Sequence, residues 1–525
     1  LPGGSYANSF GFQYHNSFLS ETLKTLAQSH LKHKPGEMAV YCNDGFSLAE
    51  MIVEKVSGKK YGVFLQDRIF SPLRLSNTGL GVGQLPPNSG VTIARYYDPA
   101  GRSDPLEAVS FLASGGLSAT AEDLCRFADS FSGKGPQILS QRSLTAMHQN
   151  QPSAFWGKLP RPTISLGLGW DLTSLPTFES AGIKVLGKSG GTGNYTSMMF
   201  TVPEHRISVA VIGAGRSGRA MEISLKVLDA YLLQKGILAT SALQEPLTLP
   251  PMAESVPDNL LAFEGYYAGD GGSIVKLKLD TANNGLTIFS TDPAHPEPAL
   301  SAIYNGGFFY DQSGKKYYLI SVAGNQYLVS STNLAEIILF QKIEPLSHPQ
   351  SLDINIDGSR WLRRNVSPYE ARMSAPGHIA TARLLPELPG YLDFGGIKKI
   401  TSPTTAGVSL ASVRDANELI LFTEQNQVTA WISGLLFTQA ELTVPLQHGN
   451  NNITISRSGN NEWRKLSHNA ILQFAAPVHA RIIVFSPTDS ILYDSAVDQG
   501  EVVAPAGSFV EVAATVGESV QIIVK

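Results

Sequence analysis

The stretch Gly187-Lys-Ser-Gly-Gly-Thr-Gly-Asn-Tyr195 decides the fold, because three incompatible motifs match residues within it or close to it. The first is a nucleotide-binding P-loop, since residues 182–189 satisfy G-x-x-x-x-G-K-[ST]. A P-loop needs a strand before its first glycine and a helix after its Lys-Ser pair, so that the helix N-terminus binds phosphate. Here residues 183–186 have strand character and a second strand-like run, 195–201, follows the glycines. The flanks argue against nucleotide binding.

The second motif is a dinucleotide fingerprint, G-x-G-x-x-G, at Gly213-Ala-Gly-Arg-Ser-Gly218. It follows a strand-like run, 206–212, and precedes a helical run, 219–233, as the fingerprint requires. An acidic residue is expected about 20 positions further on, at the end of a second strand. Residues 233–245 run into a Ser/Ala/Pro linker instead. A strand-to-helix turn that closes a domain is the better interpretation.

The third motif is the triad Lys188-Ser-Gly190 on an edge strand, with Gly191 at the bend and antiparallel strands after it. A matching element lies upstream, where Tyr41-Cys-Asn43 precedes a helical run that ends at Gly58. The predicted apolar face of that helix consists of Leu48, Met51, Ile52 and Val56.

These segments, together with 69–73, 115–124 and the Gly-Leu-Gly-Trp stretch 167–170, resemble the β-lactamase-related serine hydrolases. That family groups class C β-lactamases, D-alanyl-D-alanine carboxypeptidases, D-aminopeptidases and esterases. The resemblance covers roughly residues 1–235, with the segments in the family's order. It implies an α/β (α+β) catalytic domain of the β-lactamase/transpeptidase type.

The resemblance also implies the roles of the site residues. Tyr41 and Lys188 are expected to be catalytic, as the base that activates a serine hydroxyl. Asn43, Ser189, Gly190 and Gly191 are expected to bind substrate, with the Gly191 N–H as one oxyanion donor. Taken singly, each residue has a structural interpretation: Tyr41 as a strand-end aromatic, Lys188 as a surface charge and Asn43 as a helix cap.

The family's nucleophile lies in a Ser-x-x-Lys pair well before the Tyr-x-Asn element. Pairs with these letters begin at Ser29, Ser57, Ser273 and Ser313, and none stands in the family's order. The sequence starts at Leu1-Pro2, which matches the end of the family's motif His-x-Ser-Gly-Leu-Pro. We therefore expect the nucleophilic serine and its lysine to lie outside these residues, so that part of the catalytic domain is missing.

Beyond residue 235 the character of the sequence changes. A Pro-rich linker is predicted over 239–257, after a hydrolase domain over 1–238. Short β-like runs separated by turns predict an antiparallel β domain over 258–345, a connector over 346–375 and a second β-rich domain over 376–525. This layout resembles the family's D-aminopeptidases, in which two lipocalin-like barrels restrict the mouth of the active site.

Composition excludes other classes of function. The net charge of −4 and the absence of a basic stripe give no argument for nucleic acid. No apolar stretch reaches the ~20 residues of a membrane span. The 11 His and 2 Cys residues form no metal-binding motif, so we expect neither metal nor cofactor. The charged fraction of only 16% favours a periplasmic or secreted protein.

Two hypotheses of function follow. The first is a serine hydrolase that acts through an acyl-enzyme on a small-molecule or peptide substrate: a peptidase, carboxypeptidase or D-aminopeptidase, or else a β-lactamase or esterase. The second is a non-catalytic binding or scaffold protein that keeps the fold of the penicillin-binding proteins. The sequence does not set the oligomeric state.

Overall fold

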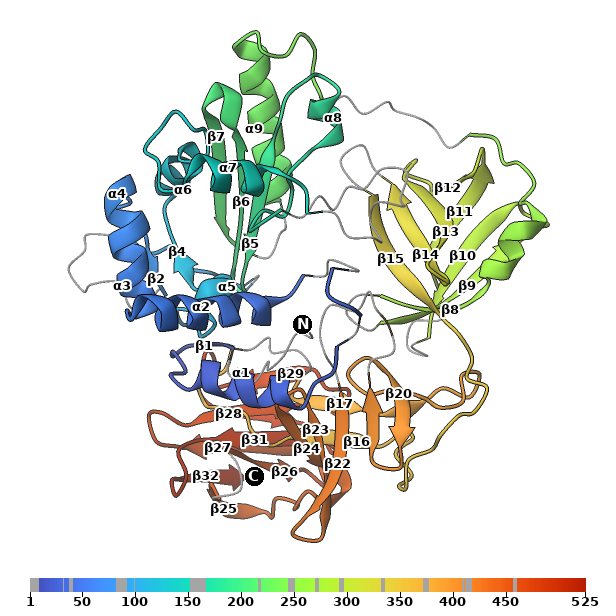
Figure 1. Cartoon of the computed structure of the whole chain (residues 1–525). Coiled ribbons are helices and arrows are strands. Elements are labelled where there is room, and N and C mark those ends of the chain that lie inside the picture. Colours follow the sequence, from blue (N-terminus) through green and yellow to red (C-terminus); the bar gives the residue numbers. More distant parts are fainter. Residues whose placement is uncertain are drawn as a thin grey trace.

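A computed structural model of the chain describes residues 9–31, 33–36, 41–81, 92–98, 100–151, 167–215, 219–243, 251–269, 273–291, 297–331, 336–371, 377–407, 410, 418–456 and 460–525. Helices and a small sheet form the first half of the chain, a barrel follows, and two further groups of strands complete it (Figure 1). The predicted order, a domain of helices and strands followed by all-β structure, is confirmed.

The helical elements of the first half are α1 (Phe18–Ala27), α2 (Asn43–Ser57), α3 (Tyr61–Leu65), η1 (Gln66–Phe70), α4 (Ser71–Leu73), α5 (Leu112–Gly115), α6 (Ala121–Asp129), α7 (Gln141–His148), α8 (Pro176–Glu179), η4 (Pro203–His205) and α9 (Ala220–Gln234). Two short strand pairs join them, β1 (Phe10–Gly11) with β3 (Ala108–Val109) and β2 (Gly79–Leu80) with β4 (Leu117–Ser118).

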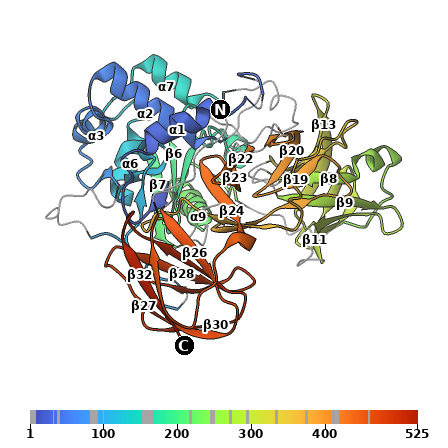
Figure 2. The same cartoon turned by 90° about the horizontal axis from the view of Figure 1, so that it is seen from below.

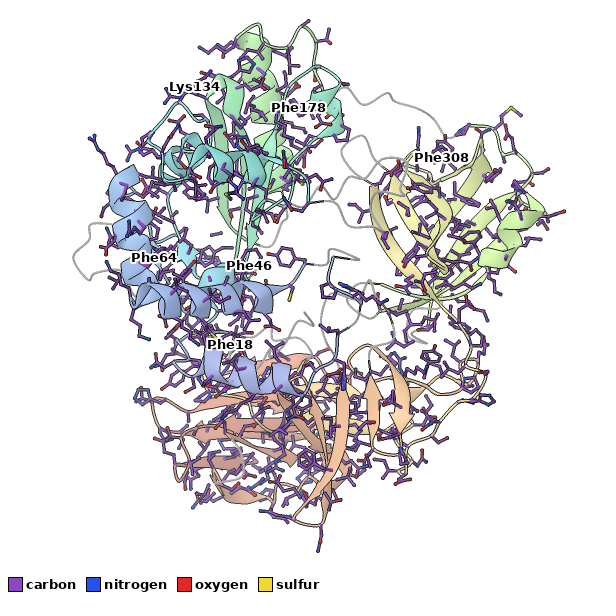
Figure 3. All side chains as sticks on the ribbon, viewed as in Figure 1. Phe18, Phe46, Phe64, Lys134, Phe178 and Phe308 are labelled. Carbon is purple, nitrogen blue, oxygen red and sulfur yellow. The ribbon has the colours of Figure 1, made fainter. Side chains whose placement is uncertain are left out.

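The central sheet of this half is antiparallel, in the order β5 (Leu186–Gly191), β6 (Tyr195–Val202), β7 (Ile207–Ala214). Successive side chains of a strand point to opposite faces. Met198 and Phe200 accordingly pack in the core that includes Leu228 of α9, whereas Met199 packs with Ala128 of α6. Helices α9 and α6 therefore cover opposite faces of the sheet, and buried Phe178 adds to the α9 side (Figure 3).

The strands around the Lys-Ser-Gly triad exclude the P-loop, because β5 contains Lys188 and strand β6, not a helix, follows the glycines. The strand and helix predicted around Gly213 are present as β7 and α9, while Arg216, Ser217 and Gly218 of the fingerprint lie outside the described residues.

Helix α2 was predicted correctly, but its buried face was not. It begins at Asn43 and ends before Gly58, whose φ of 67° is the left-handed conformation that glycine adopts at helix ends. Ile52 and Val56 of the predicted apolar face are 62% and 82% exposed. The buried residues are instead Asp44, Ser47 and Glu50, because polar groups of α5 meet this helix.

The middle of the chain forms a closed antiparallel barrel of eight strands, preceded by the short helix η5 (Asp258–Phe263) (Figure 1). Its strands are β8 (Gly265–Ala268), β9 (Ile274–Asp280), β10 (Gly285–Ser290), β11 (Pro298–Asn305), β12 (Phe308–Tyr310), β13 (Lys316–Val322), β14 (Asn325–Ser331) and β15 (Glu336–Ile343). Inward-facing side chains such as Tyr267, Leu286, Phe309 and Leu328 fill the interior.

A nine-stranded antiparallel sheet follows the barrel. Its strands, in chain order, are β16 (Arg360–Arg363), β17 (Ile379–Thr381), β18 (Arg383–Leu384), β19 (Tyr391–Asp393), β20 (Ile397–Ser402), β21 (Thr405–Gly407), β22 (Leu419–Glu424), β23 (Gln427–Ile432) and β24 (Leu435–Gln439). Strand β16 lies within the segment predicted as a connector and carries Trp361, which is fully buried.

The chain ends, after the short helix η6 (Ala440–Leu442), in a sandwich of two four-stranded sheets (Figure 2). One sheet contains β25 (Gly449–Thr454), β32 (Ser519–Val524), β27 (Ala470–Ala475) and β30 (Val502–Ala504), and the other β26 (Asn461–Lys465), β31 (Phe509–Ala513), β28 (Arg481–Phe485) and β29 (Ile491–Asp494). Leu472 and Ile522 of the first pack with Val484 and Val510 of the second. No helix among the described residues is long and apolar enough to cross a membrane.

Candidate active site

Strand β5 and the start of α2 bring Lys188 and Tyr41 together. The Lys188 Nζ lies 5.7 Å from the centroid of the Tyr41 ring, within the range of a cation–π contact. Tyr41 precedes α2, whereas Lys188 belongs to β5 and follows Tyr41 by 147 positions in the sequence. Folding thus joins the two residues that the sequence analysis expected to be catalytic.

Asp171 holds the Lys-Ser pair of β5 and was not singled out by the sequence analysis. Its Oδ2 accepts hydrogen bonds from Lys188 Nζ at 3.1 Å, from the Ser189 backbone N–H at 2.8 Å and from Ser189 Oγ at 2.5 Å. Charge-assisted bonds to a carboxylate are short and strong. The sequence did contain a signal for Asp171, because this residue directly follows the Gly-Leu-Gly-Trp stretch, which ends at Trp170.

Asn43 is the first residue of α2, and its backbone is fixed from α5. The Ser114 Oγ donates a hydrogen bond to the Asn43 carbonyl at 2.6 Å. About two turns further on, the Glu50 carboxylate accepts the Ala113 backbone N–H at 3.1 Å. Helix α5 thus binds α2 both at its first residue, Asn43, and at Glu50.

Asp44, beside Asn43, is a buried carboxyl group. It is 4% exposed, and its Oδ2 has no hydrogen-bond partner among the described residues. Burial disfavours the charged form and raises the pKa of Asp44 to about 7. An ionisable group therefore titrates near neutral pH directly beside the candidate site.

The glycines of the hairpin β5–β6 serve different purposes. A Cβ on Gly190 would lie 2.3 Å from Ser197 Oγ, and a Cβ on Gly193 would lie 2.7 Å from Glu107 Oε1. These two glycines are therefore required by neighbouring protein atoms. Around Gly191 a Cβ would meet no described atom within 4 Å, so only this glycine leaves the edge of β5 open to a ligand.

Of the four Ser-x-x-Lys serines, one follows α1, one ends α2 and two belong to the barrel region. Ser57 ends α2, whereas Asn43 begins it, and fourteen rises of about 1.5 Å place them roughly 20 Å apart. Ser273 and Ser313 belong to the barrel region, where the Ser313 Oγ bonds Asp311. The Ser29 Oγ bonds the Thr25 carbonyl at the end of α1, and its partner Lys32 lies outside the described residues.

Among the residues that the structure describes, no group of three or more His, Cys, Asp or Glu side chains could hold a metal ion. Cys42 and Cys125 are both free thiols. The described side chains at this site offer general acid–base and hydrogen-bonding chemistry, centred on Tyr41, Lys188 and the open edge of β5.

The described residues thus combine a strand edge that bears Lys-Ser-Gly, a tyrosine that contacts the lysine and helices on both sides of an antiparallel sheet. Residues 1–231 match the family model described as Beta-lactamase. The first 231 residues are therefore similar to the beta-lactamase family, a family of serine hydrolases.

Two curated relatives are similar to this chain. Penicillin-binding protein 4 of Amycolatopsis lactamdurans is 24% identical over 251 residues, which cover 46% of this chain and 62% of the relative. Penicillin-binding protein 4* of Bacillus subtilis is 26% identical over 187 residues, which cover 33% of this chain and 39% of the relative. The matched region thus spans less than two thirds of the length of either relative.

Among solved structures, the octameric penicillin-binding protein homologue from Pyrococcus abyssi is 23% identical, with a TM-score of 0.35. The alignment covers 59% of this chain and 66% of that chain.

Proposed function

We propose that this protein is a serine hydrolase that acts through an acyl-serine intermediate on a peptide, amide or ester. The contact between Lys188 and Tyr41 beside the open edge of β5 carries the proposal. A scaffold needs neither a tyrosine hydroxyl nor an ammonium at this point. The family match over residues 1–231 supports the same class of reaction.

In the proposed mechanism, Tyr41 takes the proton of a serine hydroxyl as the serine oxygen attacks the substrate carbonyl carbon. The Lys188 ammonium stabilises negative charge on the tyrosine oxygen, and Asp171 keeps Lys188 in place. The negative charge that develops on the carbonyl oxygen is stabilised by the Gly191 N–H, one of two expected donors. Collapse releases the amine or alcohol, which receives a proton from Tyr41, and water then hydrolyses the acyl-serine.

Asn43 and Ser189 are proposed to bind the substrate beside the acyl group, with the backbone of Gly190 and Gly191 along the strand edge. Substrates with D-configured residues or cell-wall-like peptides fit this proposal, since they lie within the chemistry of the family. Carboxypeptidase, D-aminopeptidase, β-lactamase and esterase activities all use the same intermediate, so the first experiment detects the intermediate.

We propose further that the reacting serine is none of Ser29, Ser57, Ser273 and Ser313, because these serines follow α1, end α2 or belong to the barrel region, and so stand outside the segments that carry Tyr41 and Lys188. The test is to treat the full-length natural protein with a fluorophosphonate or a fluorescent penicillin and to map the adduct by peptide mass spectrometry. An adduct on another serine supports the proposal. Complete lack of an adduct favours the alternative, a non-catalytic binding or scaffold protein.

The protein is also proposed to work outside the cytoplasm, in the periplasm or after secretion, on the grounds of its low charged fraction of 16%. Fractionation of the source cells with a fluorescent penicillin tests this. Label confined to the cytoplasmic fraction contradicts the proposed location.

A further inference from the structure

Glu107 is a buried carboxylate that binds the turn directly after the open edge of β5. It is 3% exposed and accepts hydrogen bonds from Thr192 Oγ1 at 2.5 Å, from the Gly193 N–H at 2.9 Å and from the Asn194 N–H at 3.3 Å. Buried carboxylates are stable only when such donors surround them. The close approach also explains Gly193, whose Cβ would lie 2.7 Å from Glu107 Oε1.

The turn held by Glu107 fixes the backbone of Gly191. Thr192 and Tyr195 close the turn through two bonds, Thr192 N–H to the Tyr195 carbonyl at 2.9 Å and Tyr195 N–H to Thr192 Oγ1 at 3.2 Å. Gly191 is the residue before this turn and the last residue of β5. Any movement of the turn therefore displaces the N–H that the proposed function assigns to the oxyanion.

Glu107 is joined in turn to the C-terminal half of the chain. It directly precedes β3, which pairs with β1, where Phe10 stands opposite Val109. On its other side β1 bonds the segment Tyr369–Ala371: the Phe12 N–H donates to the Tyr369 carbonyl at 2.5 Å and the Ala371 N–H to the Phe10 carbonyl at 3.0 Å. Figure 1 shows β1 between α2 and the C-terminal strands.

The segment Tyr369–Ala371 is itself anchored by two buried ion pairs. Arg363 Nη2 lies 2.7 Å from Glu370 Oε2, with both side chains fully buried. Arg481 binds Asp494 through two hydrogen bonds of 3.0 and 2.8 Å and also donates to the Glu370 carbonyl. Bidentate pairs of this kind fix geometry. The segment is therefore held against both the nine-stranded sheet and the sandwich.

We propose that Glu107 is a positioning residue for the active site, and that the C-terminal segment Tyr369–Ala371 supports it through β1 and β3. The all-β half of the protein then has a role in the reaction, because it holds the oxyanion donor in place. This inference rests on the proposed function for its catalytic consequence, and its structural consequence can be measured without catalysis.

The first experiment compares Glu107→Ala and Glu107→Gln with the wild type in the full-length protein. The acylation rate constant at saturating fluorescent penicillin is expected to fall about tenfold to a hundredfold in Glu107→Ala, as for loss of one well-placed oxyanion donor or less. The half-saturating probe concentration should stay within about threefold. Glu107→Gln should be intermediate, because its remaining oxygen still accepts the Gly193 N–H. A loss of folded protein lowers the amount acylated, not this rate constant.

The second experiment disrupts the contact between β1 and the C-terminal segment Tyr369–Ala371, away from Glu107 itself. A Cβ on Gly11 would lie 2.5 Å from the Tyr369 carbonyl oxygen, so Gly11→Ala separates β1 from the C-terminal segment. Gly285→Ala is the matched control, because its Cβ would lie 2.8 Å from the Ala302 carbonyl oxygen within the barrel. Gly11→Ala should slow acylation severalfold and add little in the Glu107→Ala background, since both act through one connection. Gly285→Ala should leave the rate unchanged.

Hydrogen exchange of the peptide that covers residues 191–195 provides the readout that needs no catalysis. Faster exchange in Glu107→Gln and Gly11→Ala, but not in Gly285→Ala, supports the inference even if the protein acylates no probe, in which case only the proposed function fails. Unchanged exchange and acylation in Glu107→Gln and Glu107→Ala overturn the inference. Equal effects of Gly11→Ala and Gly285→Ala on the 191–195 peptide overturn the part assigned to the C-terminal segment.

Discussion

The hairpin β5–β6 and the barrel strand β14 are both antiparallel structure, but they are held in place by different means. From Tyr327 to Ser331 every residue of β14 is buried, and Leu328 packs in the interior of the barrel. The last three residues of β5 are exposed, and the carboxylates of Asp171 and Glu107 hold that end. The barrel is fixed by apolar packing, whereas the candidate site is fixed by a few directional bonds that leave its edge open.

The largest effect on stability is expected in the barrel. Phe309→Ala removes a ring that is fully buried against Tyr304, at a centroid distance of 5.2 Å. Truncation of a buried phenylalanine costs about 3–5 kcal/mol of the free energy of unfolding, which denaturant unfolding will measure. Acylation by the probe should be unchanged below the unfolding transition. A loss under about 1 kcal/mol, or slower acylation of the folded variant, contradicts the distinction between the two regions.

The largest effect on the reaction is expected at Tyr41. Tyr41→Phe keeps the ring under Lys188 but removes the hydroxyl, and a general base is typically worth a hundredfold or more. The acylation rate constant should therefore fall at least a hundredfold. Tyr231→Phe is the matched control, because Lys235 Nζ lies 5.3 Å from the Tyr231 ring on α9, and it should acylate normally. Near wild-type acylation of Tyr41→Phe removes Tyr41 from the mechanism.

A smaller effect is expected at Asp171. Asp171→Asn removes the charge that pairs with Lys188 and leaves one oxygen to accept from Ser189, so acylation should slow about tenfold, in the range of a lost charge-assisted hydrogen bond. Asp311→Asn is the control, because Asp311 likewise accepts several bonds in a turn of the barrel. If both variants acylate at the wild-type rate, the carboxylate does not position the Lys-Ser pair.

A further effect on stability depends on pH and concerns Asp44. Its folded-state pKa of about 7 lies above the ordinary value of 3.8, so the folded form binds the proton more tightly than the unfolded form. Stability from this group is present below about pH 4 and is lost as the pH rises toward 7. Asp44→Asn should therefore match the wild type in melting temperature near pH 4 and exceed it at pH 8. An equal difference at both pH values contradicts the raised pKa.

The same contrast explains what could be predicted from the sequence. Apolar runs with turn residues between them predicted all-β structure after the first half, because burial on alternate sides leaves a periodic pattern. The strand after the Lys-Ser-Gly triad and the Tyr-x-Asn helix were also predicted, whereas the strand expected over 183–186 begins only at Leu186. The exact domain boundaries and the roles of Tyr41, Asn43, Lys188, Ser189, Gly190 and Gly191 stay predictions.

The residues that support the site left no such pattern. Glu107 precedes Thr192 by 85 positions, and only the folded chain brings them together. A single buried acid has no period, so sequence analysis had no reason to prefer Glu107 to another glutamate. The buried face of α2 was missed for a related reason. Ser47 and Glu50 are buried because α5 offers hydrogen-bonding groups at that face, which hydropathy does not record.

The most direct test of the account is to map the covalent adduct formed by the full-length natural protein with a fluorescent penicillin or a fluorophosphonate, in the wild type and in Tyr41→Phe. The account predicts one labelled serine, distinct from Ser29, Ser57, Ser273 and Ser313, that reacts at least a hundredfold more slowly in the variant. No adduct on the wild type, or equal labelling of both proteins, would contradict it.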